Sequence, residues 1–349
     1  MIENMPFSLG YTMPAEWERH HATWISWPKN PNSFRGNILR DVEKAYVRMV
    51  EELSANEKVE ILVDGNGEKI RIADMLDAAN CRKDNVNLHI IPTKDVWIRD
   101  YGPIFVRRAD IRRIDLAYTH WKFNAWGNKY GDMKDDTRAP EMMPLNEFRK
   151  FKVDMVLEGG SVDTNGLGTF LTTEQCLLNK NRNPELSKGE IEGFLRNYLG
   201  ALNIIWLGEG LEGDDTDGHV DDIARFVSKD TVVCAYEENT EDSNCAVLER
   251  NLKILENAKD QDDGRLRIIK MPMPEKVEVD EMRLPASYLN FYIANKLVLV
   301  PTFDSKNDSV AIGIMEKLFP DRKVVGIDCR GLVEGFGAIH CATQQQPAY

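Results

Sequence analysis

Apolar side chains recur at helical spacing in five stretches of the chain, and this pattern predicts five amphipathic helices. The expected helices cover residues 37–54, 68–79, 187–200, a stretch that begins near 243, and 308–320. The third has the clearest boundaries, because Ser187 and Glu190 form a capping-box pattern and Gly200 suits the end of a helix.

Short apolar runs bounded by Gly, Pro, Asn and Asp lie between these helices and predict strands. They cover residues 59–63, 88–91, 103–106, 153–157, 203–207, 221–226, 231–236, 266–269, 288–293, 296–300 and 323–327. Strands outnumber helices, so this mixed α/β pattern fits poorly with a plain doubly wound sheet, in which the two alternate. One helix for roughly every 70 residues favours a repeated unit of several strands and one helix, although the residues do not visibly repeat.

The stretch 121–147 follows neither period. It is polar and aromatic, so we expect a long surface excursion there, of the kind that often carries function. The sequence alone does not say whether this stretch covers a pocket.

The composition is that of an ordinary globular chain with an acidic charge balance. At 349 residues, two domains or one large repeat-built domain are both compatible with the length. The net charge of −13 argues against a general binder of nucleic acid or of anionic membranes, and it is mildly compatible with a cationic ligand. The chain shows no signal-peptide pattern and no apolar run of about 18 residues, so we expect a cytoplasmic protein. The sequence is also compatible with a homo-oligomer.

Six cysteines are scattered through the chain without a C-x-x-C pair. In a chain of this length, such spacing predicts reduced and mostly buried thiols rather than a disulfide framework. They are Cys81, Cys176, Cys234, Cys245, Cys329 and Cys341.

Two acidic residues stand where a carboxylate could be buried. In the stretch 95–103, an extended backbone would put Asp100 on an apolar face just before a Gly-Pro turn, and a cationic substrate could be its partner. The alternative is a structural ion pair of Arg99 with Asp95 or Asp100. Glu158 ends an apolar strand before two glycines, which places a carboxylate at a loop mouth, unless it is simply an exposed turn residue.

Two further stretches carry a histidine and a thiol. In 213–222, His219 and Asp221 would share one face of a strand, and nearby carboxylates would keep the histidine protonated as a general acid. A metal-free acidic turn or a cation site is the alternative there. In 335–343, Cys341 follows a Gly-rich run, and it could be an activated nucleophile or an inert buried thiol. Together these groups would suit attack on a guanidinium carbon.

Five motifs resemble the agmatine deiminase family, a peptidylarginine-deiminase-like group within the guanidine-modifying superfamily. They lie at residues 13–28, 97–103, 158–161, 216–221 and 339–341, in the family's order, and they span nearly the whole chain. The resemblance implies a five-bladed α/β propeller, with residues 1–349 as a single catalytic domain and the active site near its axis. This agrees with the five expected helices and replaces the two-domain interpretation.

The resemblance also implies the reaction. Cys341 would attack the guanidinium of agmatine, and His219 would protonate the departing ammonia and later activate water. A covalent thiouronium would form and then release N-carbamoylputrescine. The enzyme would need no metal and no cofactor, and its partner would be a small cationic guanidine.

Four residues would then bind that substrate. Asp100 and Asp221 would accept guanidinium N–H groups, Glu158 would support the guanidinium or the histidine, and Trp97 would line the pocket. Carboxylates bind a planar guanidinium well, since it presents paired donors. The same carboxylates should raise the pKa of the Cys341 thiol in the empty site, and a bound cation should lower it.

One departure from the family bears on specificity. The family usually carries a longer Gly-rich run ending in Gly-Asn-Ile-His-Cys, where this chain has Phe336 and Ala338. A peptidyl-arginine or another small guanidine is therefore the alternative substrate, and Asp214 and Asp215 are candidate partners for the distal ammonium of agmatine. Outside this enzyme class, a non-catalytic cation-binding propeller and a metal protein using the same histidine, carboxylate and thiol remain alternatives.

Overall fold

The computed structural model describes residues 4–109 and 114–349 of the chain. The strands are β1 (His20–Ser26), β2 (Lys58–Val63), β3 (Val86–Ile90), β4 (Ile104–Ala109), β5 (Ile114–Lys122), β6 (Arg149–Val156), β7 (Asp163–Thr164), β8 (Thr169–Thr173), β9 (Asn203–Leu207), β10 (Ala224–Ser228), β11 (Thr231–Tyr236), β12 (Arg267–Pro272), β13 (Glu278–Val279), β14 (Met282–Arg283), β15 (Tyr292–Ala294), β16 (Leu297–Thr302), β17 (Lys323–Asp328) and β18 (Thr343–Pro347). The helices are α1 (Ile38–Ser54), α2 (Asn66–Ala78), α3 (Ile98–Tyr101), α4 (Ala125–Asn128), α5 (Ala139–Met142), α6 (Glu174–Leu177), α7 (Lys188–Leu199), α8 (Ser243–Asn257), α9 (Asp308–Leu318) and α10 (Arg330–Val333). Three 3₁₀ turns lie near the site, namely η4 (Gly131–Arg138), η5 (Gly159–Ser161) and η6 (Val220–Asp222).

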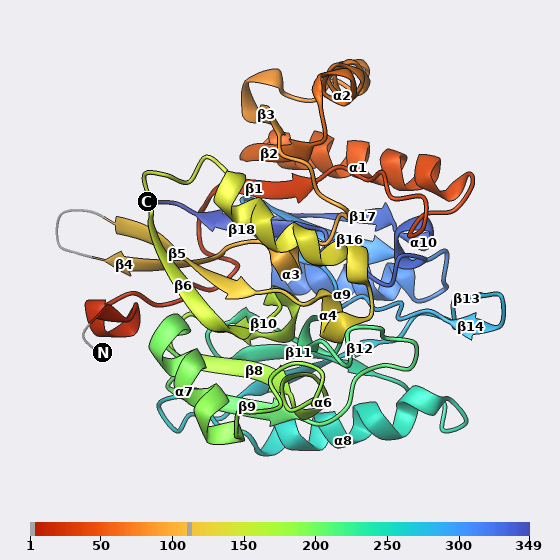
Figure 1. The fold of residues 1–349 in the computed structure, drawn as a ribbon. Helices are drawn as coiled ribbons and strands as arrows, with labels where there is room; N and C mark the ends of the chain where they lie inside the picture. Colours follow the sequence, from red (N-terminus) through yellow and green to blue (C-terminus); the bar gives the residue numbers. More distant parts are fainter. Residues whose placement is uncertain (1–3, 110–113) are drawn as a thin grey trace.

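Five of the sheets formed by the described residues share one connectivity. In each of them, the first strand is antiparallel to the second, and the second is parallel to the third. Their strand orders are β18-β1-β2-β3, β4-β5-β6, β7-β8-β9, β10-β11-β12 and β15-β16-β17. The first sheet joins the two ends of the chain, because β18 pairs with β1 (Figure 1). The strands β13 and β14 form a separate hairpin.

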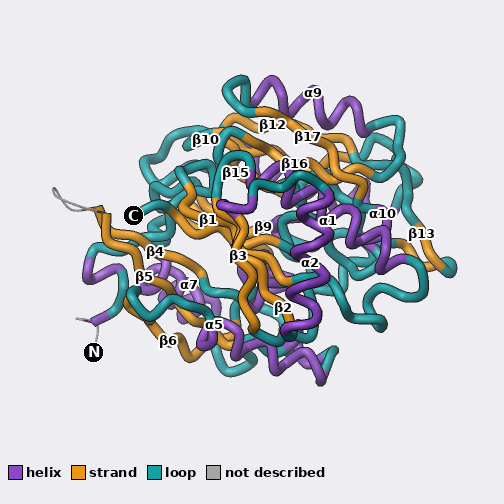
Figure 2. Tube along the Cα trace, turned by 90° about the horizontal axis from the view of Figure 1, so that it is seen from above, coloured by secondary structure: helices purple, strands orange, loops and turns teal. Residues whose placement is uncertain are grey.

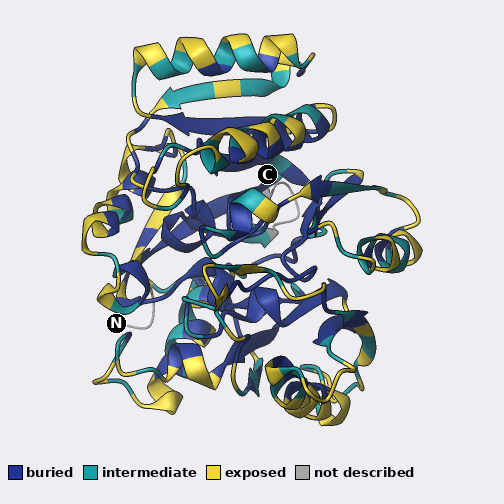
Figure 3. Ribbon diagram, turned by 90° about the vertical axis from the view of Figure 1, so that its right-hand side faces the viewer, coloured by how far each residue is buried: buried dark blue, intermediate teal, exposed yellow. Residues whose placement is uncertain are grey.

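The parallel pairs need crossover connections, and helices supply most of them. The long helices α1, α7, α8 and α9 connect the parallel strands of four sheets, and α2 adds β3 to the first sheet. Figure 2 shows α9 at one edge of the molecule, outside the strands β12 and β17. The outward faces of the helices are exposed while the strands between them are mostly buried (Figure 3). Among the described residues, every helix is too short or too polar to cross a membrane.

The predicted mixed α/β pattern is confirmed, with all five long helices present and each expected strand overlapping an observed one. The capping box of Ser187 and Glu190 is formed, and Gly200 ends α7 in the left-handed conformation. The assignment of one helix to each unit was wrong, however. The helix α2 is an extra crossover in the first sheet, and the β5-to-β6 connection carries no long helix.

That connection is the stretch 121–147, which was predicted to be a surface excursion, and many of its residues are exposed. It contains α4, η4 and α5, and several of its apolar side chains are buried. They include Trp121, Phe123, Trp126, Met133, Met143 and Leu145. The buried side chains pack these short helices against the core. The aromatic residues without helical or strand periodicity therefore indicate a packed segment of irregular backbone.

Candidate active site

The predicted site residues come together because they occupy equivalent places in different sheets. Cys341 precedes β18, Asp100 precedes β4, Glu158 precedes β7, and His219 and Asp221 precede β10. Each of these is the first strand of a sheet, so the segments entering the sheets converge. Two local expectations were wrong, since Asp100 lies on the short helix α3 and Asp221 lies in the turn η6 rather than on strands.

Cys341 lines a cavity, and the residue is almost fully buried. Its Sγ lies 3.6 Å from Asp221 Oδ2 and accepts a hydrogen bond of 3.1 Å from Asn290 Nδ2. Burial, and then Asp221, Asp222 and Asp100, raise the pKa of this thiol well above its usual value, against the hydrogen bond from Asn290. The raised pKa expected for the empty site is confirmed.

His219 is fully buried and stands beside Asp100, with 3.7 Å between its Nδ1 and Asp100 Oδ1. Burial alone would lower the pKa of this imidazole, but Asp100, Cys176 and Asp221 raise it well above its usual value. These neighbours therefore favour the protonated ring, which is the form that a general acid requires. Its backbone N–H donates to Asp214 Oδ2 at 3.1 Å, which fixes the loop that carries it.

Asp100 is held by two donors from different segments. Trp126 Nε1 donates to Oδ2 at 2.8 Å, and the backbone N–H of Gly160 donates to Oδ1 at 3.0 Å. Burial raises the pKa of this carboxyl, while His219 opposes the shift and Asp221 adds to it. The alternative of an ion pair with Arg99 was wrong, because Arg99 donates instead to Gln345 Oε1 at 2.6 Å.

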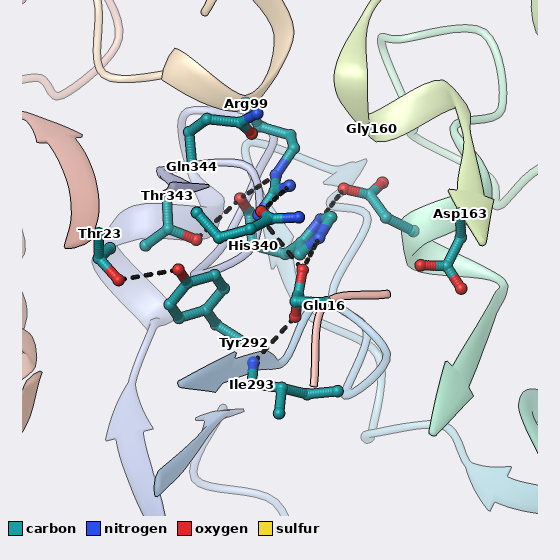
Figure 4. A network of polar contacts seen from close by, with 12 residues as sticks. Glu16, Thr23, Arg99, Gly160, Asp163, Tyr292, Ile293, His340, Thr343 and Gln344 are labelled. Atoms are coloured by element: carbon teal, nitrogen blue, oxygen red, sulfur yellow. Dashed lines mark hydrogen bonds and ion pairs between the residues drawn. The ribbon is translucent and has the colours of Figure 1, made fainter. Parts of the chain in front are cut away.

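Asp221 contacts a buried network, in which Figure 4 labels His340 and Glu16. His340 Nδ1 contacts Asp221 Oδ2 at 2.6 Å, and His340 Nε2 contacts Glu16 Oε2 at 2.8 Å. Glu16 also pairs with Arg225 at 2.9 Å. Burial would raise the pKa of Asp221, but the hydrogen bond and charge of His340 lower it below its usual value. Asp221 therefore stays an anion, and its Oδ1 has no hydrogen-bond partner.

Glu158 is fully buried, so the exposed-turn alternative was wrong. Arg182 Nε donates to its Oε1 at 2.7 Å, and the same guanidinium reaches Asp217 Oδ2 at 2.6 Å. The second oxygen of Glu158, Oε2, is buried without a hydrogen-bond partner. Such an unpaired buried acceptor is costly unless a donor arrives from a ligand.

Gly160 is the backbone around which these groups converge. A Cβ atom at this position would lie 2.6 Å from His219 Nδ1, 2.9 Å from Asp221 Oδ2 and 3.0 Å from Asp100 Oδ1. No side chain fits in that space, so the glycine is required for close approach.

The cavity in front of these groups has a volume of about 410 Å³. Trp97 lines it, and two glycines pack against this indole, because a Cβ at Gly337 or Gly335 would lie 2.5 Å or 2.9 Å from its ring. Phe336, between those glycines, lines the cavity with a φ of +69°, a strained value for a residue with a side chain.

The irregular segment 121–147 supplies another wall of the cavity. Trp126, Tyr130 and Met133 line it, and Trp126 also holds Asp100. The hydroxyl of Tyr130 donates to Asp215, which also lines the cavity. The connection that lacks a long helix thus covers the site.

Comparisons with known proteins agree with this arrangement. The sequence model of the Porphyromonas-type peptidyl-arginine deiminase family matches residues 12–347. The chain belongs to this family.

Individual relatives resemble this deiminase over nearly its whole length. An agmatine deiminase of Pseudomonas aeruginosa is 36% identical, over 98% of this chain and 97% of its own length. The structure of an Enterococcus faecalis agmatine deiminase superposes with a TM-score of 0.90 at 30% identity, covering 99% of this chain and 98% of that one. A substrate-bound C. jejuni agmatine deiminase with a cysteine-to-serine substitution superposes with a TM-score of 0.85 at 31% identity, covering 96% of both chains. The predicted resemblance is confirmed.

Two groups of side chains, among the residues that the structure describes, have the spacing to hold a metal ion. Glu158, Cys176 and His219 form one, and Asp221, Asp222 and Cys341 form the other, with ligand atoms within 4.8 Å of one another in each group. The first suits a dication poorly, because Arg182 already bonds Glu158 and the histidine is protonated. In the second group, Asp221 and Cys341 belong to the predicted guanidinium site.

Sequence reasoning missed several residues that shape this deiminase site. Asn290 contacts the Cys341 sulfur, Cys176 lies beside His219, and Trp126 holds Asp100. Only the Trp126 region gave a signal, as an aromatic stretch without periodicity. The remaining five cysteines are free thiols, four of them buried, as predicted.

Proposed function

We propose that this chain hydrolyses the guanidinium of agmatine to N-carbamoylputrescine and ammonia. The observation that carries the proposal is the meeting of a cavity-lining thiol, a buried histidine whose pKa is raised, and buried carboxylate oxygens without hydrogen-bond partners. Full-length likeness to agmatine deiminases supports the same substrate.

The guanidinium is bound by acceptors that lack partners within the protein. Asp221 Oδ1 and Glu158 Oε2 are both buried and unpaired, and Asp100 lies across from them. A planar cation with paired N–H donors satisfies such oxygens from several sides. Trp97 then packs against the bound group along the cavity wall.

The bound guanidinium lowers the pKa of the Cys341 thiol, the thiol loses its proton to water, and the thiolate then attacks the guanidinium carbon, forming a C–S bond and a tetrahedral adduct. His219 gives its proton to one amino group, the C–N bond breaks, and ammonia leaves behind a covalent thiouronium. Water then adds to the same carbon as His219 takes up a proton, and the C–S bond breaks to give the ureido product and the free thiolate. No metal or cofactor takes part in this scheme.

The outer part of the cavity favours an amine over a carboxylate at the distal end of the substrate. Asp132, Asp215, Asp280 and Glu334 line it, against a single cationic side chain, Arg35, among its lining residues. Of the two predicted ammonium partners, Asp215 lines the cavity, where Tyr130 and Lys129 already contact its carboxylate. Asp214 is instead engaged by backbone N–H groups of its own loop.

The proposal extends to the architecture of the chain and to the location of the enzyme. The five sheets of shared connectivity, each preceded by a segment that enters the site, support a five-bladed α/β propeller in which residues 1–349 form one catalytic domain. A cytoplasmic enzyme that uses a small metabolite, with no role for nucleic acid or membrane, fits the acidic charge of −13.

Ammonia release from three substrates tests the assignment. We expect agmatine to be hydrolysed with a kcat/KM at least about 100-fold above free arginine and a blocked arginine peptide, because the acidic mouth repels a carboxylate and a peptide needs more room. The peptide is included because the family model that matches this chain is named after peptidyl-arginine deiminase. A preference for the peptide would replace agmatine as the substrate.

Phe336 should restrict substrate size. Because its ring lines the cavity from a left-handed backbone position, Phe336→Gly should widen the cavity and raise the peptide-to-agmatine ratio of kcat/KM by about 10-fold. Phe336→Leu keeps most of the bulk and serves as the control. Equal ratios in wild type and Phe336→Gly would remove Phe336 from specificity.

A further inference from the structure

The first of the five motifs, residues 13–28, has no role in the mechanism above, although Glu16 within it is buried. Glu16 precedes β1. Its carboxylate contacts Arg99 on α3, Arg225 on β10 and His340 before β18 (Figure 4). Two guanidinium groups and an imidazole thus surround this carboxylate, so its charge is compensated without water.

The ring of His340 lies between two buried carboxylates. Its Nδ1 is 2.6 Å from Asp221 Oδ2, and its Nε2 is 2.8 Å from Glu16 Oε2. Burial would raise the pKa of Glu16, but Arg225 and then His340 lower it well below its usual value. The pKa of Asp221 is likewise lowered, against burial, by its contact with His340. Ionised carboxylates only accept hydrogen bonds, so both nitrogens of the ring carry a hydrogen.

This contact uses one oxygen of Asp221 and leaves the other free. Oδ2 accepts from the His340 ring, whereas Oδ1 is buried and has no hydrogen-bond partner. A donor from a bound ligand is the partner that Oδ1 lacks.

We propose that Glu16 is a positioning residue for the deiminase reaction, which holds the doubly protonated His340 ring against Asp221 Oδ2 and so reserves Asp221 Oδ1 for the substrate guanidinium. Glu16 does not line the cavity and acts through His340, while Arg225 and Arg99 hold its carboxylate in place. The inference rests on the proposed function for the identity of the bound cation. The arrangement of Glu16, His340 and Asp221 does not depend on which guanidine binds.

Glu16→Gln separates the charge of this arrangement from its geometry. The Ile293 N–H and Arg225 face Oε1 of Glu16, and both can only donate, so the amide oxygen of the glutamine takes that place. The amide NH₂ then faces His340 Nε2, which can accept only if the ring is neutral. His340 would keep its N–H to Asp221 but lose its positive charge, and Asp221 would become protonated more readily as the pH falls.

The variant leaves the other ionisable groups of the network in place. Around Glu16 these include Asp163 and Tyr292 in addition to the two arginines. Those that face Asp221 are Asp100, Asp214, His219, Asp222, Arg225 and Cys341.

Nitrogen NMR of the enzyme labelled with ¹⁵N-histidine, without substrate at pH 7, tests the state of the ring. We expect two N–H groups on His340 in the wild type and one in Glu16→Gln. His340→Asn identifies these signals, because they disappear in that variant. A bare ring nitrogen on His340 in the wild type would overturn the proposal.

Agmatine binding, measured by calorimetry on enzyme that carries Cys341→Ala to prevent turnover, tests the effect on the site. We expect Glu16→Gln to raise the Kd about 10-fold at pH 5.5 and less than about 3-fold at pH 8.5, because the protonated Asp221 binds a guanidinium poorly. His340→Asn should behave in the same way, since its amide can still donate to Asp221 but carries no charge.

The control is Glu57→Gln, which changes another buried glutamate beside a histidine, with 3.4 Å between its Oε1 and His20 Nδ1. It should change neither the His340 signals nor the pH dependence of binding. An equal loss of affinity at both pH values in Glu16→Gln would overturn the proposal, and so would failure of Glu16→Gln and His340→Asn to fold, because the role would then be structural. The expected ring states without any agmatine binding would overturn agmatine as the substrate while confirming the action of Glu16 on His340.

Discussion

Replacing Cys341 by alanine should lower ammonia release from agmatine by at least about 10⁴-fold while the protein stays folded. The sulfur is the nucleophile in the proposed reaction, and alanine offers no atom that can take its place. The change removes one buried atom beside a cavity, so the free energy of unfolding should change by no more than about 2 kcal/mol. Activity and thermal melting of the purified variant check both parts.

The matched control is Cys245→Ser, which alters a half-buried cysteine on α8 that lies outside the cavity lining. It should keep full activity. Residual turnover above about 1% in Cys341→Ala would exclude the covalent mechanism.

The raised pKa of the Cys341 thiol adds a sharper expectation. Asp221, Asp222 and Asp100 oppose its ionisation in the empty site, and a bound guanidinium would offset their charge. Substrate should therefore help to generate its own nucleophile. A small guanidinium ion too short to block the cavity should speed alkylation of Cys341 at pH 7, and an unchanged rate would contradict this.

The parts of the site that were predictable from sequence are those with local signals. Asp100, Glu158 and Cys341 each stand at an end of an apolar run or a Gly-rich stretch, where buried backbone gives way to a turn. Their motifs also carried the family resemblance. That these three side chains would meet in one site could not be predicted from local sequence. Their meeting depends on the connectivity that the sheets share.

The missed residues lacked a local signal. Asn290 lies within the run 288–293, which was predicted to be a strand, yet β15 starts only at Tyr292. The strand β18 was missed because its sequence, Thr-Gln-Gln-Gln-Pro, has no apolar alternation, although all five residues are buried. Pairing with β1 stabilises it, so tertiary contact overrode local propensity.

The number of predicted long helices equalled the number of sheets with the shared connectivity, but the helices are not distributed one to each sheet. The extra helix α2 compensated for the missing long helix between β5 and β6. That connection needed an irregular path, because it places Trp126 against Asp100 and Tyr130 against Asp215. Function therefore explains the departure from the repeat.

Replacing His219 by glutamine should lower kcat by about 10³- to 10⁴-fold, since both the departure of ammonia and the attack of water would lose their proton carrier. Hydrolysis of the thiouronium should suffer as well, so the covalent adduct should accumulate with agmatine and be visible by mass spectrometry of the intact protein. His21→Gln, on β1, is the control and should behave as wild type. Absence of an adduct with normal turnover would remove His219 from its role.

The same substitution has an effect on stability whose sign depends on pH. The folded-state pKa of His219 is raised well above 6.5, mainly by Asp100 against the opposing effect of burial. Its stabilising contribution is therefore fully present below the unfolded pKa of about 6.5 and is lost as pH rises through the folded pKa. The melting temperature of His219→Gln should fall furthest below wild type at pH 6, and the difference should shrink at alkaline pH. A constant difference across that range would show that His219 is not a buried cation in the resting enzyme.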